Sequence, residues 1–407
     1  MSALTHRRRG TLALGVALAL AAARAAAPQQ GLPPTRSIGR TIATAPDSFQ
    51  SVHDVRQLSD GRVLVNDPAA RRLVLLDSAL RNPVVVLDTN SASARHYPHR
   101  SDSRLLPYPG DTTLFIDGDA LALLMIGPSG TVARVVSLPS PDLDFASATT
   151  DAAGRLVFEL YPSIKPLPPV ASLELSAPVR DSAAIVRADL ATHHQDTAAK
   201  AALPARYPGV TSDAGTTSPV SNPIHISDGW TVLSDGTVAV VRSQEFHVDW
   251  VTASGAHSTS PRFPHDWFRI TDSTKEALLD SLRRANAERD STLRARAAAA
   301  GRAMIVSPMS TLYPDVSQLP DYRPPFFLRS PFDVSADADG NLWIHEGLSR
   351  INVLGGPPVF DVVNPRAGLF DRVQFPGGTV VVGFGPGVVY LSSRNGATSS
   401  LVRARIR

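Results

Sequence analysis

The chain has 407 residues with 34 Pro, 27 Gly, no Cys and 43% hydrophobic residues, so it can bury a large core and is neither collagen-like nor disordered. The lack of Cys excludes disulfide frameworks and Cys-ligated zinc sites. Only three Lys and six Glu occur among 40 basic and 37 acidic residues, so charged helix formers are scarce beside abundant Val, Thr, Gly and Pro. This composition indicates a mainly β protein.

Residues 1–27 predict a secretory signal peptide. Basic residues at Arg7-Arg8-Arg9 precede an apolar run of about thirteen residues, Thr11–Ala23, and small residues suited to cleavage follow it. The run is shorter than the roughly 20 residues that span a bilayer, although a retained membrane anchor remains the alternative. No Cys follows the run, which excludes a bacterial lipid anchor. We therefore expect a secreted or periplasmic protein with no membrane anchor after cleavage.

Removal of the signal also removes most of the net charge. Four Arg are lost, which leaves 36 basic and 37 acidic residues. Nucleic-acid binding through a basic face then has no support in the composition, so we expect no nucleic-acid partner.

A four-stranded unit recurs along residues 28–407. It consists of a strand, a Gly turn, a strand, a polar loop, a strand, a second turn and a fourth strand. The clearest copy has strands at Val52–Gln57, Val63–Val65, Leu73–Leu76 and Val84–Leu87, with its first turn at Asp60-Gly61. Further copies begin near Leu105, Phe145, Trp230 and Phe332, and a three-stranded sixth copy starts at Thr379. With the long insertions set aside, each unit has about 44 residues, as a propeller blade does.

The predicted fold is therefore an all-β, six-bladed β-propeller that forms a single domain over residues 28–407. An open sandwich or a chain of two domains is the alternative. The segment Ser37–Ala43 is a strand with no partner nearby in sequence. We expect it to pair with Ser399–Ile406 as the fourth strand of the last blade, because closure of the ring hides an exposed sheet edge.

The long insertions all belong to one class of loop. They join the second strand to the third or one blade to the next, whereas the loops of the other face are short. They span 91–104, 162–181, 199–224 and 263–330. Because functional residues concentrate in variable loops on a rigid scaffold, we expect the working surface on this face.

One helix is expected, in the 263–330 insertion between blades four and five. Ser273–Glu276 matches a capping box, and Asp280 and Arg284 stand at i,i+4. Leu278, Leu279, Leu282 and Ala285 form the apolar stripe. The helix should end near Gly301. A lid over the mouth of the propeller and a solvated decoration both remain open.

Several of these residues carry a family resemblance. Asp60–Val65 followed by Arg72–Asp77 resembles the repeat of NHL and TolB-like six-bladed propellers. A wider set of motifs resembles exported six-bladed propellers of environmental bacteria: Ser234–Gly236, Phe246–Trp250, Asp266-Trp267, Pro324–Phe326, Asp339–Trp343 and Val381–Gly385. The resemblance covers nearly all of residues 28–407. It implies the fold, and that group carries no assigned reaction.

The segment Ser335–Glu346 has the spacing of an EF-hand calcium loop. However, Leu342–Ile344 is typical of a strand, which would carry Glu346 about 20 Å from the turn. We therefore interpret the segment as a hairpin turn and expect no metal there.

Histidines offer the other metal or acid–base candidates. They are His96, His99, His193, His194 and His265. No carboxylate or third His stands at a diagnostic spacing, so surface histidines are the alternative. Motifs for a nucleophilic Ser, a zinc protease and a phosphate loop are missing. The sequence therefore predicts no catalytic residue, no metal and no cofactor.

The ends of the second strands should form a ring on the insertion-rich face. Counting from each first turn gives candidate ligand-binding residues that are all polar or aromatic: Asp67, Asp117, Tyr161, Arg242, Glu346 and Arg394. Exposed loop edges are commonly polar, so a solvated edge is the alternative.

From these features we expect an exported, monomeric and non-catalytic propeller that recognises a protein, peptide or glycan on its insertion-rich face. The alternative is a lactonase-like propeller hydrolase or lyase with a divalent metal in the central tunnel.

Overall fold

The computed structural model describes the chain from Gly31 to Arg407 with gaps. The described ranges are 31–46, 49–90, 96–99, 103–160, 169–170, 179–211, 217–218, 220–224, 226–299, 312–326, 332–347 and 357–407. The predicted signal peptide, residues 1–27, lies outside these ranges and stays a prediction.

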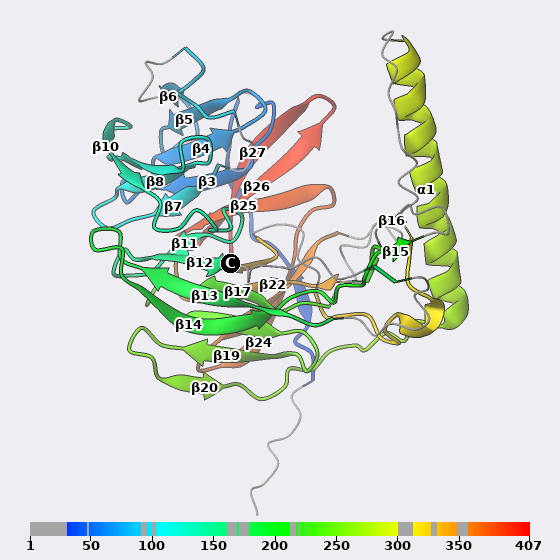
Figure 1. Ribbon diagram of the computed structural model, residues 1–407. Coiled ribbons are helices and arrows are strands. Elements are labelled where there is room, and N and C mark those ends of the chain that lie inside the picture. The colour runs from blue at the N-terminus through cyan, green and yellow to red at the C-terminus, as the bar shows by residue number, and fades with distance from the viewer. Residues whose placement is uncertain are drawn as a thin grey trace, which may run out of the picture. The chain divides into compact units, whose positions relative to one another are not determined.

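The prediction of a six-bladed propeller is confirmed: six sheets form a ring, and one helix lies between blades four and five (Figure 1). Blade one contains β3 (Asp54–Gln57), β4 (Val63–Asp67), β5 (Arg72–Leu76) and β6 (Val84–Leu87). Blade two contains β7 (Leu105–Pro107), β8 (Thr113–Asp117), β9 (Ala122–Ile126) and β10 (Val132–Ser137). Blade three contains β11 (Thr149–Thr150), β12 (Leu156–Leu160), β13 (Ser182–Ala188) and β14 (Gln195–Ala202). Blade four contains β17 (Gly229–Val232), β18 (Val238–Arg242), β19 (His247–Val251) and β20 (His257–Thr259). Blade five contains β21 (Val334–Ala336), β22 (Leu342–His345), β23 (Val359–Asn364) and β24 (Gly368–Gln374). Blade six contains β25 (Thr379–Gly385), β26 (Val388–Asn395) and β27 (Thr398–Arg405).

Strands inside a blade are apolar on both faces because each blade packs between two neighbours. In β4, Val63 and Val65 pack toward blade six, in a cluster that contains Tyr390. Leu64 lies between them in sequence and packs toward blade two, in a cluster with Phe115. Successive strand residues point to opposite faces, so one unbroken apolar run supplies two interfaces. The core is thus divided among the blade interfaces.

The first strand of each blade lies innermost, and its direction defines the two ends of the ring. Each first strand begins after a link between blades and ends at the short first turn. The long insertions therefore lie at the starts of the inner strands, and the short turns lie at their ends. We call these the insertion side and the turn side.

The N-terminal segment closes the ring, but it uses two strands where the sequence predicted one. β1 (Thr35–Ser37) pairs in parallel with β24 and adds a fifth strand to blade five. β2 (Thr41–Thr44) pairs antiparallel with β27 and supplies the fourth strand of blade six, as predicted. The single strand Ser37–Ala43 is thus divided at the residues that cross between the blades.

Two features fix this crossing. Arg36 forms an ion pair with Asp371 of β24 at 2.6 Å and donates to the Ile406 carbonyl of blade six at 2.7 Å. A Cβ at Gly39 would lie 2.8 Å from the Arg405 carbonyl oxygen, so only glycine fits between the blades there. The chain therefore passes from one blade to the next within a few residues.

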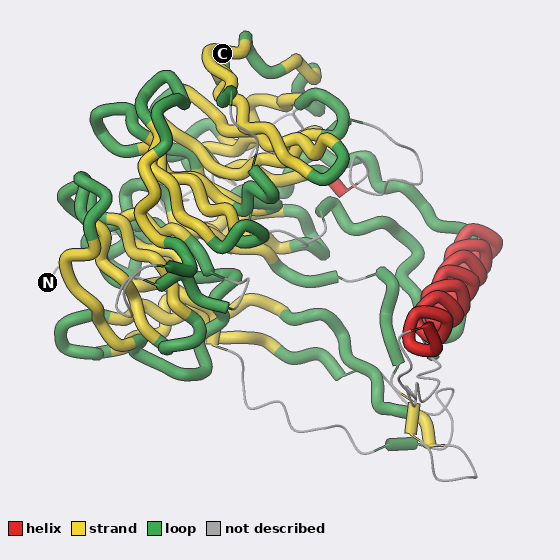
Figure 2. The backbone as a smooth tube through the Cα atoms, turned by 90° about the horizontal axis from the view of Figure 1, so that it is seen from above, coloured by secondary structure: helices red, strands yellow, loops and turns green. Residues whose placement is uncertain are grey.

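The predicted helix is α1 (Asp272–Ala299), the one red element in Figure 2 that is longer than a turn. Two details of the prediction are wrong. The Thr271 hydroxyl, two residues before Ser273, accepts the Thr274 N–H at 3.3 Å and caps the helix. The carboxylate of Asp280 pairs with Arg283, and not with Arg284, at 2.8 Å.

The buried side of α1 is also narrower than the predicted stripe. Leu279 is buried, whereas Ala285 is exposed. Leu279 packs against the short 3-10 helix η3 (Val316–Gln318) and its neighbours in a small cluster with Ile224, Ile270 and Leu319. Lys275 is 1% exposed and donates to the Leu319 carbonyl at 3.1 Å and to Asp321 at 2.8 Å. The small ladder of β15 (Val210–Thr211) and β16 (Thr217–Ser218) belongs to the 199–224 insertion, which also supplies Ile224 to this cluster. The two insertions thus share a small core of their own, and the lid prediction stays untested.

Within the described ranges, no helix combines the length and the apolar character that crossing a membrane requires.

Candidate functional site

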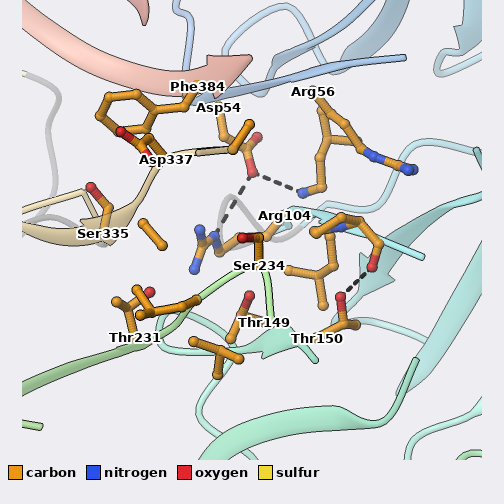
Figure 3. Close-up of a pocket in the computed structure, with 18 of the residues that line it drawn as sticks. Asp54, Arg56, Arg104, Thr149, Thr150, Thr231, Ser234, Ser335, Asp337 and Phe384 are labelled. Atoms are coloured by element: carbon orange, nitrogen blue, oxygen red, sulfur yellow. Dashed lines mark hydrogen bonds and ion pairs between the residues drawn. The ribbon is translucent and has the colours of Figure 1, made fainter. Parts of the chain in front are cut away.

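A cavity of about 900 Å³ runs along the axis of the ring. Residues from the inner strands of all six blades line it: β3, β7, β11, β17, β21 and β25. Figure 3 shows how side chains from different blades converge there, among them Asp54, Arg104, Thr231 and Phe384. The volume lies within the range of small-molecule binding sites. We call this cavity the axial tunnel.

At the turn side of the axial tunnel, carboxylates close the first turns. The Asp337 carboxylate accepts from the Asp339 N–H, from both the backbone and side-chain amides of Asn341, and from Trp343 Nε1, at 2.8 to 2.9 Å. Asp151 likewise accepts the N–H groups of the turn in blade three and pairs with Arg155 at 2.7 Å. These carboxylates hold the turns, because their own blades supply their donors.

This geometry confirms the interpretation of Ser335–Glu346 as a hairpin turn. Gly340 has φ of +80°, as the turn requires, and Leu342–His345 form β22. Glu346 follows at the other end of that strand.

At the insertion side, a charged pair lies on the tunnel wall. Asp54 is 2% exposed; its Oδ2 accepts the Leu105 N–H at 2.8 Å and lies 3.8 Å from Arg104 Nε (Figure 3). The Arg104 guanidinium donates to the carbonyls of Ala146 at 2.6 Å and Ala148 at 3.2 Å. Burial lowers the pKa of Arg104, and the Asp54 and Asp144 carboxylates oppose that effect.

Two atoms of this pair have no hydrogen-bond partner in the described part of the chain. They are Asp54 Oδ1 and Arg104 Nε, and both are buried. A buried acceptor or donor that stays unpaired costs about 1–3 kcal/mol, so such groups commonly mark a functional site. Both residues line the axial tunnel, so the pair leaves one acceptor and one donor unsatisfied at its wall.

Glu159 supplies an acid–base group at the same end. It stands in β12, is 9% exposed and lines the axial tunnel. Burial, reinforced by the nearby Asp144 carboxylate, raises its pKa from 4.5 to about 7, although a hydrogen bond from Trp230 opposes the shift. Trp230 Nε1 lies 3.5 Å from Glu159 Oε2. A carboxyl group with a pKa near neutrality can take up or release a proton under ordinary conditions.

Sequence reasoning missed Asp54, Arg104, Asp144, Glu159 and Trp230. One signal was available: Glu159 interrupts the apolar strand Leu156–Leu160 and is one of only six glutamates in the chain. A charged residue inside an otherwise buried strand needs a partner or a function.

The residues of the predicted ligand ring lie at the ends of the second strands. They are therefore one strand farther from the axis than the inner strands that line the axial tunnel. Asp67 ends β4, is fully buried and accepts the Gln50 and Ser51 N–H groups of the link between blades. Asp117 ends β8 and accepts the N–H groups of Asp119 and Ala120. Both carboxylates therefore hold neighbouring loops.

The other ring members differ in burial. Arg242 ends β18 and pairs with Asp228 and Asp249 at 2.7 Å each. Glu346 is 6% exposed, whereas Arg394 is exposed and donates to the Gly396 carbonyl at 3.2 Å. Tyr161 lies outside the described residues. Ligand binding by this ring remains a prediction.

The histidine candidates stay apart from the axial tunnel. The rings of His96 and His99 lie 5.8 Å apart, and that of His265 packs against Phe246 and Trp267. Burial lowers the pKa of His265 to about 4, so this ring is neutral at ordinary pH.

The donor set at the tunnel does not fit a divalent metal. Within the described ranges, no three His, Asp or Glu side chains converge as ligands. The Asp54 carboxylate faces Arg104, and the Asp337 carboxylate is occupied by the donors of its turn. We therefore derive no chemical step through a metal.

Comparisons with known proteins give only distant matches. No family model matches the chain, and no curated protein matches it in sequence. Among solved structures, virginiamycin B lyase from Staphylococcus aureus is 10% identical with a TM-score of 0.38, over 90% of this chain and 99% of that chain. Regucalcin, a calcium-binding protein from Agrobacterium tumefaciens, is 10% identical with a TM-score of 0.39, over 91% and 97%. A gluconolactonase from Xanthomonas campestris is 10% identical with a TM-score of 0.36, over 92% and 97%. At this level of similarity, none of these matches assigns an activity to this chain.

The expectation of a non-catalytic binding propeller is corrected by the axial tunnel, which holds a buried acid–base group that the sequence reasoning missed. Its concave wall holds a carboxyl group, Glu159, whose pKa burial brings to about 7. Such perturbed groups in a cleft are typical of active sites, and loop length alone did not reveal this one.

Proposed function

We propose that this protein is a propeller hydrolase that opens a lactone or ester at the insertion side of the axial tunnel. Glu159 would be the general base and Arg104 the group that stabilises negative charge on the substrate oxygen. The observation that carries the proposal is the buried Glu159 carboxyl group on the same tunnel wall as the Arg104–Asp54 pair.

The reaction follows from these two groups. Glu159 takes a proton from a water molecule, whose oxygen forms a bond to the carbonyl carbon. Negative charge then develops on the carbonyl oxygen, where a guanidinium in a poorly solvated site stabilises it more strongly than water would. The ring C–O bond breaks, and the proton held by Glu159 passes to the departing alkoxide to give a hydroxy acid.

Residues around Glu159 would hold it in position. Ser147 Oγ accepts the Glu159 N–H at 3.2 Å, and the Asp144 N–H donates to the Glu159 carbonyl at 3.3 Å. Trp230 approaches the carboxylate from the neighbouring blade. The first two contacts fix the backbone of Glu159, and the indole N–H is the contact that limits the rotation of its side chain. A general base needs such a fixed position. A lyase reaction would use the same carboxylate to remove a proton from carbon.

The test is a screen of lactones and phenyl esters with the wild-type protein and the Glu159→Gln variant. Removal of a general base should lower kcat by about 10²–10⁴-fold. Because the base acts when deprotonated, wild-type activity should rise as the pH increases through about 7, the pKa of Glu159. Glu245→Gln is the matched control, since Glu245 is exposed and pairs with the exposed Arg262. Full activity of Glu159→Gln would overturn the proposal.

Export through the predicted signal peptide, as the resemblance to exported propellers implies, also remains part of the proposal. Detection of the mature protein outside the cytoplasm, with residues 1–27 removed, would test it.

A further inference from the structure

The charge of the axial tunnel limits the substrates that it can accept. Its described lining contains six carboxylate residues and two arginines. The carboxylates are Asp54, Asp111, Asp144, Asp151, Glu159 and Asp337, and the arginines are Arg56 and Arg104. An excess of one charge sign in a cleft concentrates ligands of the opposite sign. The tunnel therefore disfavours anions and favours a substrate with a positive group.

The turn side does not offer a place for that positive group. Asp151 and Asp337 are occupied by the donors of their turns, and Asp111 accepts the Ser59 N–H at 3.0 Å. Arg56 donates to the Tyr108 carbonyl at 3.3 Å and to Thr113. These groups need no ligand to complete their hydrogen bonds.

The insertion side differs because one of its carboxylate oxygens lacks a donor. Asp54 is 2% exposed and lines the tunnel, and its Oδ1 has no hydrogen-bond partner among the described residues. A protonated amine supplies both the N–H donor and the positive charge that this oxygen lacks. Trp230 lines the same end, and an indole is the aromatic ring that attracts a cation most strongly.

Next to this acceptor stands a donor that also lacks a hydrogen-bond partner. Arg104 Nε is buried without a hydrogen-bond partner and lies 3.8 Å from the other oxygen of Asp54. A carbonyl oxygen is the complement of an N–H donor. A ligand that satisfies both atoms therefore carries an ammonium group and a carbonyl group a few bonds apart, as an α-amino ester or an α-amino lactone does.

We propose that the axial tunnel selects α-amino lactones or α-amino esters, with the substrate ammonium on Asp54 and its carbonyl oxygen on Arg104. This inference rests on the proposed hydrolase function and specifies its substrate class. The bound cation also has a consequence for the base: a positive charge near Glu159 favours its ionised, proton-accepting form.

Three probes with the same lactone ring separate the contributions of the ammonium group and of the carbonyl group to binding. α-Amino-γ-butyrolactone carries the ammonium, its N-acetyl derivative keeps the nitrogen without the charge, and γ-butyrolactone lacks the group. Binding is measured by calorimetry on Glu159→Gln, at about pH 6, where the amine carries its proton. We expect the amino lactone to bind at least about tenfold more tightly than the other two, which corresponds to roughly 1.4 kcal/mol.

Asp54→Asn tests the assignment within this design. The amide keeps an oxygen for the Leu105 N–H but removes the charge, so the preference for the amino lactone should fall to about onefold. Glu245→Gln should keep the full preference. Thermal melts of each variant show whether it is folded. If Asp54→Asn does not fold, the comparison of the three probes on Glu159→Gln alone still tests the substrate class.

The outcomes separate this inference from the proposed function. Equal binding of the three probes, or an unchanged preference in Asp54→Asn, would overturn the substrate class, even if Glu159→Gln abolishes turnover. A preference that depends on Asp54, together with full turnover by Glu159→Gln, would support the binding site and overturn the role of Glu159.

Discussion

The two ends of the axial tunnel contain the same kinds of charged residue in different surroundings. At the turn side, Asp337 receives four hydrogen bonds from its own blade. At the insertion side, Asp54 has one carboxylate oxygen without a partner among the described residues, and Glu159 has one contact, at 3.5 Å, from the indole of Trp230.

This difference distinguishes a structural carboxylate from a candidate catalytic one. A carboxylate that accepts several N–H bonds from its own blade holds its turn. Glu159, with its single donor at a buried position, keeps its proton to higher pH, which lowers stability above that pH but allows acid–base chemistry. The number of donors around a buried acid is therefore more informative than its presence in a cavity.

The largest expected effect comes from opening the ring, because both ends depend on its closure. Deletion of residues 28–44 removes β1 and β2 and leaves β27 as an unpaired edge. We expect several kcal/mol of stability to be lost and Tm to fall by about 5 °C or more, as measured by calorimetry. Deletion of residues 28–34, which keeps both strands, is the control. An unchanged Tm in the longer deletion would show that these strands do not close the ring.

A smaller loss of stability, on removal of one carboxylate at each end, distinguishes the two ends of the tunnel directly. Asp337→Ala leaves the turn and Trp343 donors of blade five unpaired, so we expect a loss of about 2–4 kcal/mol in urea unfolding. Asp144→Ala removes two longer contacts, from the Ala146 N–H at 3.4 Å and the Ser147 N–H at 3.2 Å. It also removes a charge that favours the charged form of Arg104 and disfavours that of Glu159, so the net cost should be less than about 1 kcal/mol. Equal losses in the two variants would contradict the distinction.

The smallest expected effect is a gain in stability, whereas the two preceding effects are losses. The pKa of Glu159 is raised from 4.5 to about 7 in the folded protein, so folded Glu159 binds more protons than unfolded Glu159 between these values. Wild-type stability should therefore decrease as the pH rises from about 4.5 to about 7 and stay lower above it. Glu159→Gln removes this loss and should be more stable than wild type by up to about 3 kcal/mol at pH 8.

Unfolding of both proteins from pH 4 to 9 measures this effect. Asp361, whose pKa burial raises to about 6, contributes equally to both proteins, so the difference between the two curves isolates Glu159. A constant difference across the pH range would show that Glu159 has an ordinary pKa.

The repeat, the blade count and the position of the helix were predictable from sequence, because each depends on local signals. Short apolar runs identify the strands, Gly residues identify the turns, and the capped amphipathic segment around Leu279 identifies the helix, each within a short window of sequence. Ring closure was predicted in outline, since β2 completes blade six as expected. The division of the predicted strand Ser37–Ala43 into β1 and β2 at Gly39 was not predicted, because it depends on the short distance between Gly39 and Arg405 of another blade.

The candidate site was decided by the tertiary structure. Asp54, Arg104, Glu159 and Trp230 come from four different blades. Three of them stand at or beside the start of an inner strand, and Glu159 stands near the end of a second strand. Counting along second strands led instead to residues such as Asp67, whose donors come from a link between blades. The ring brings the inner strands of all blades to one axis, and the chemical character of a buried acid depends on the donors and charges that reach it there.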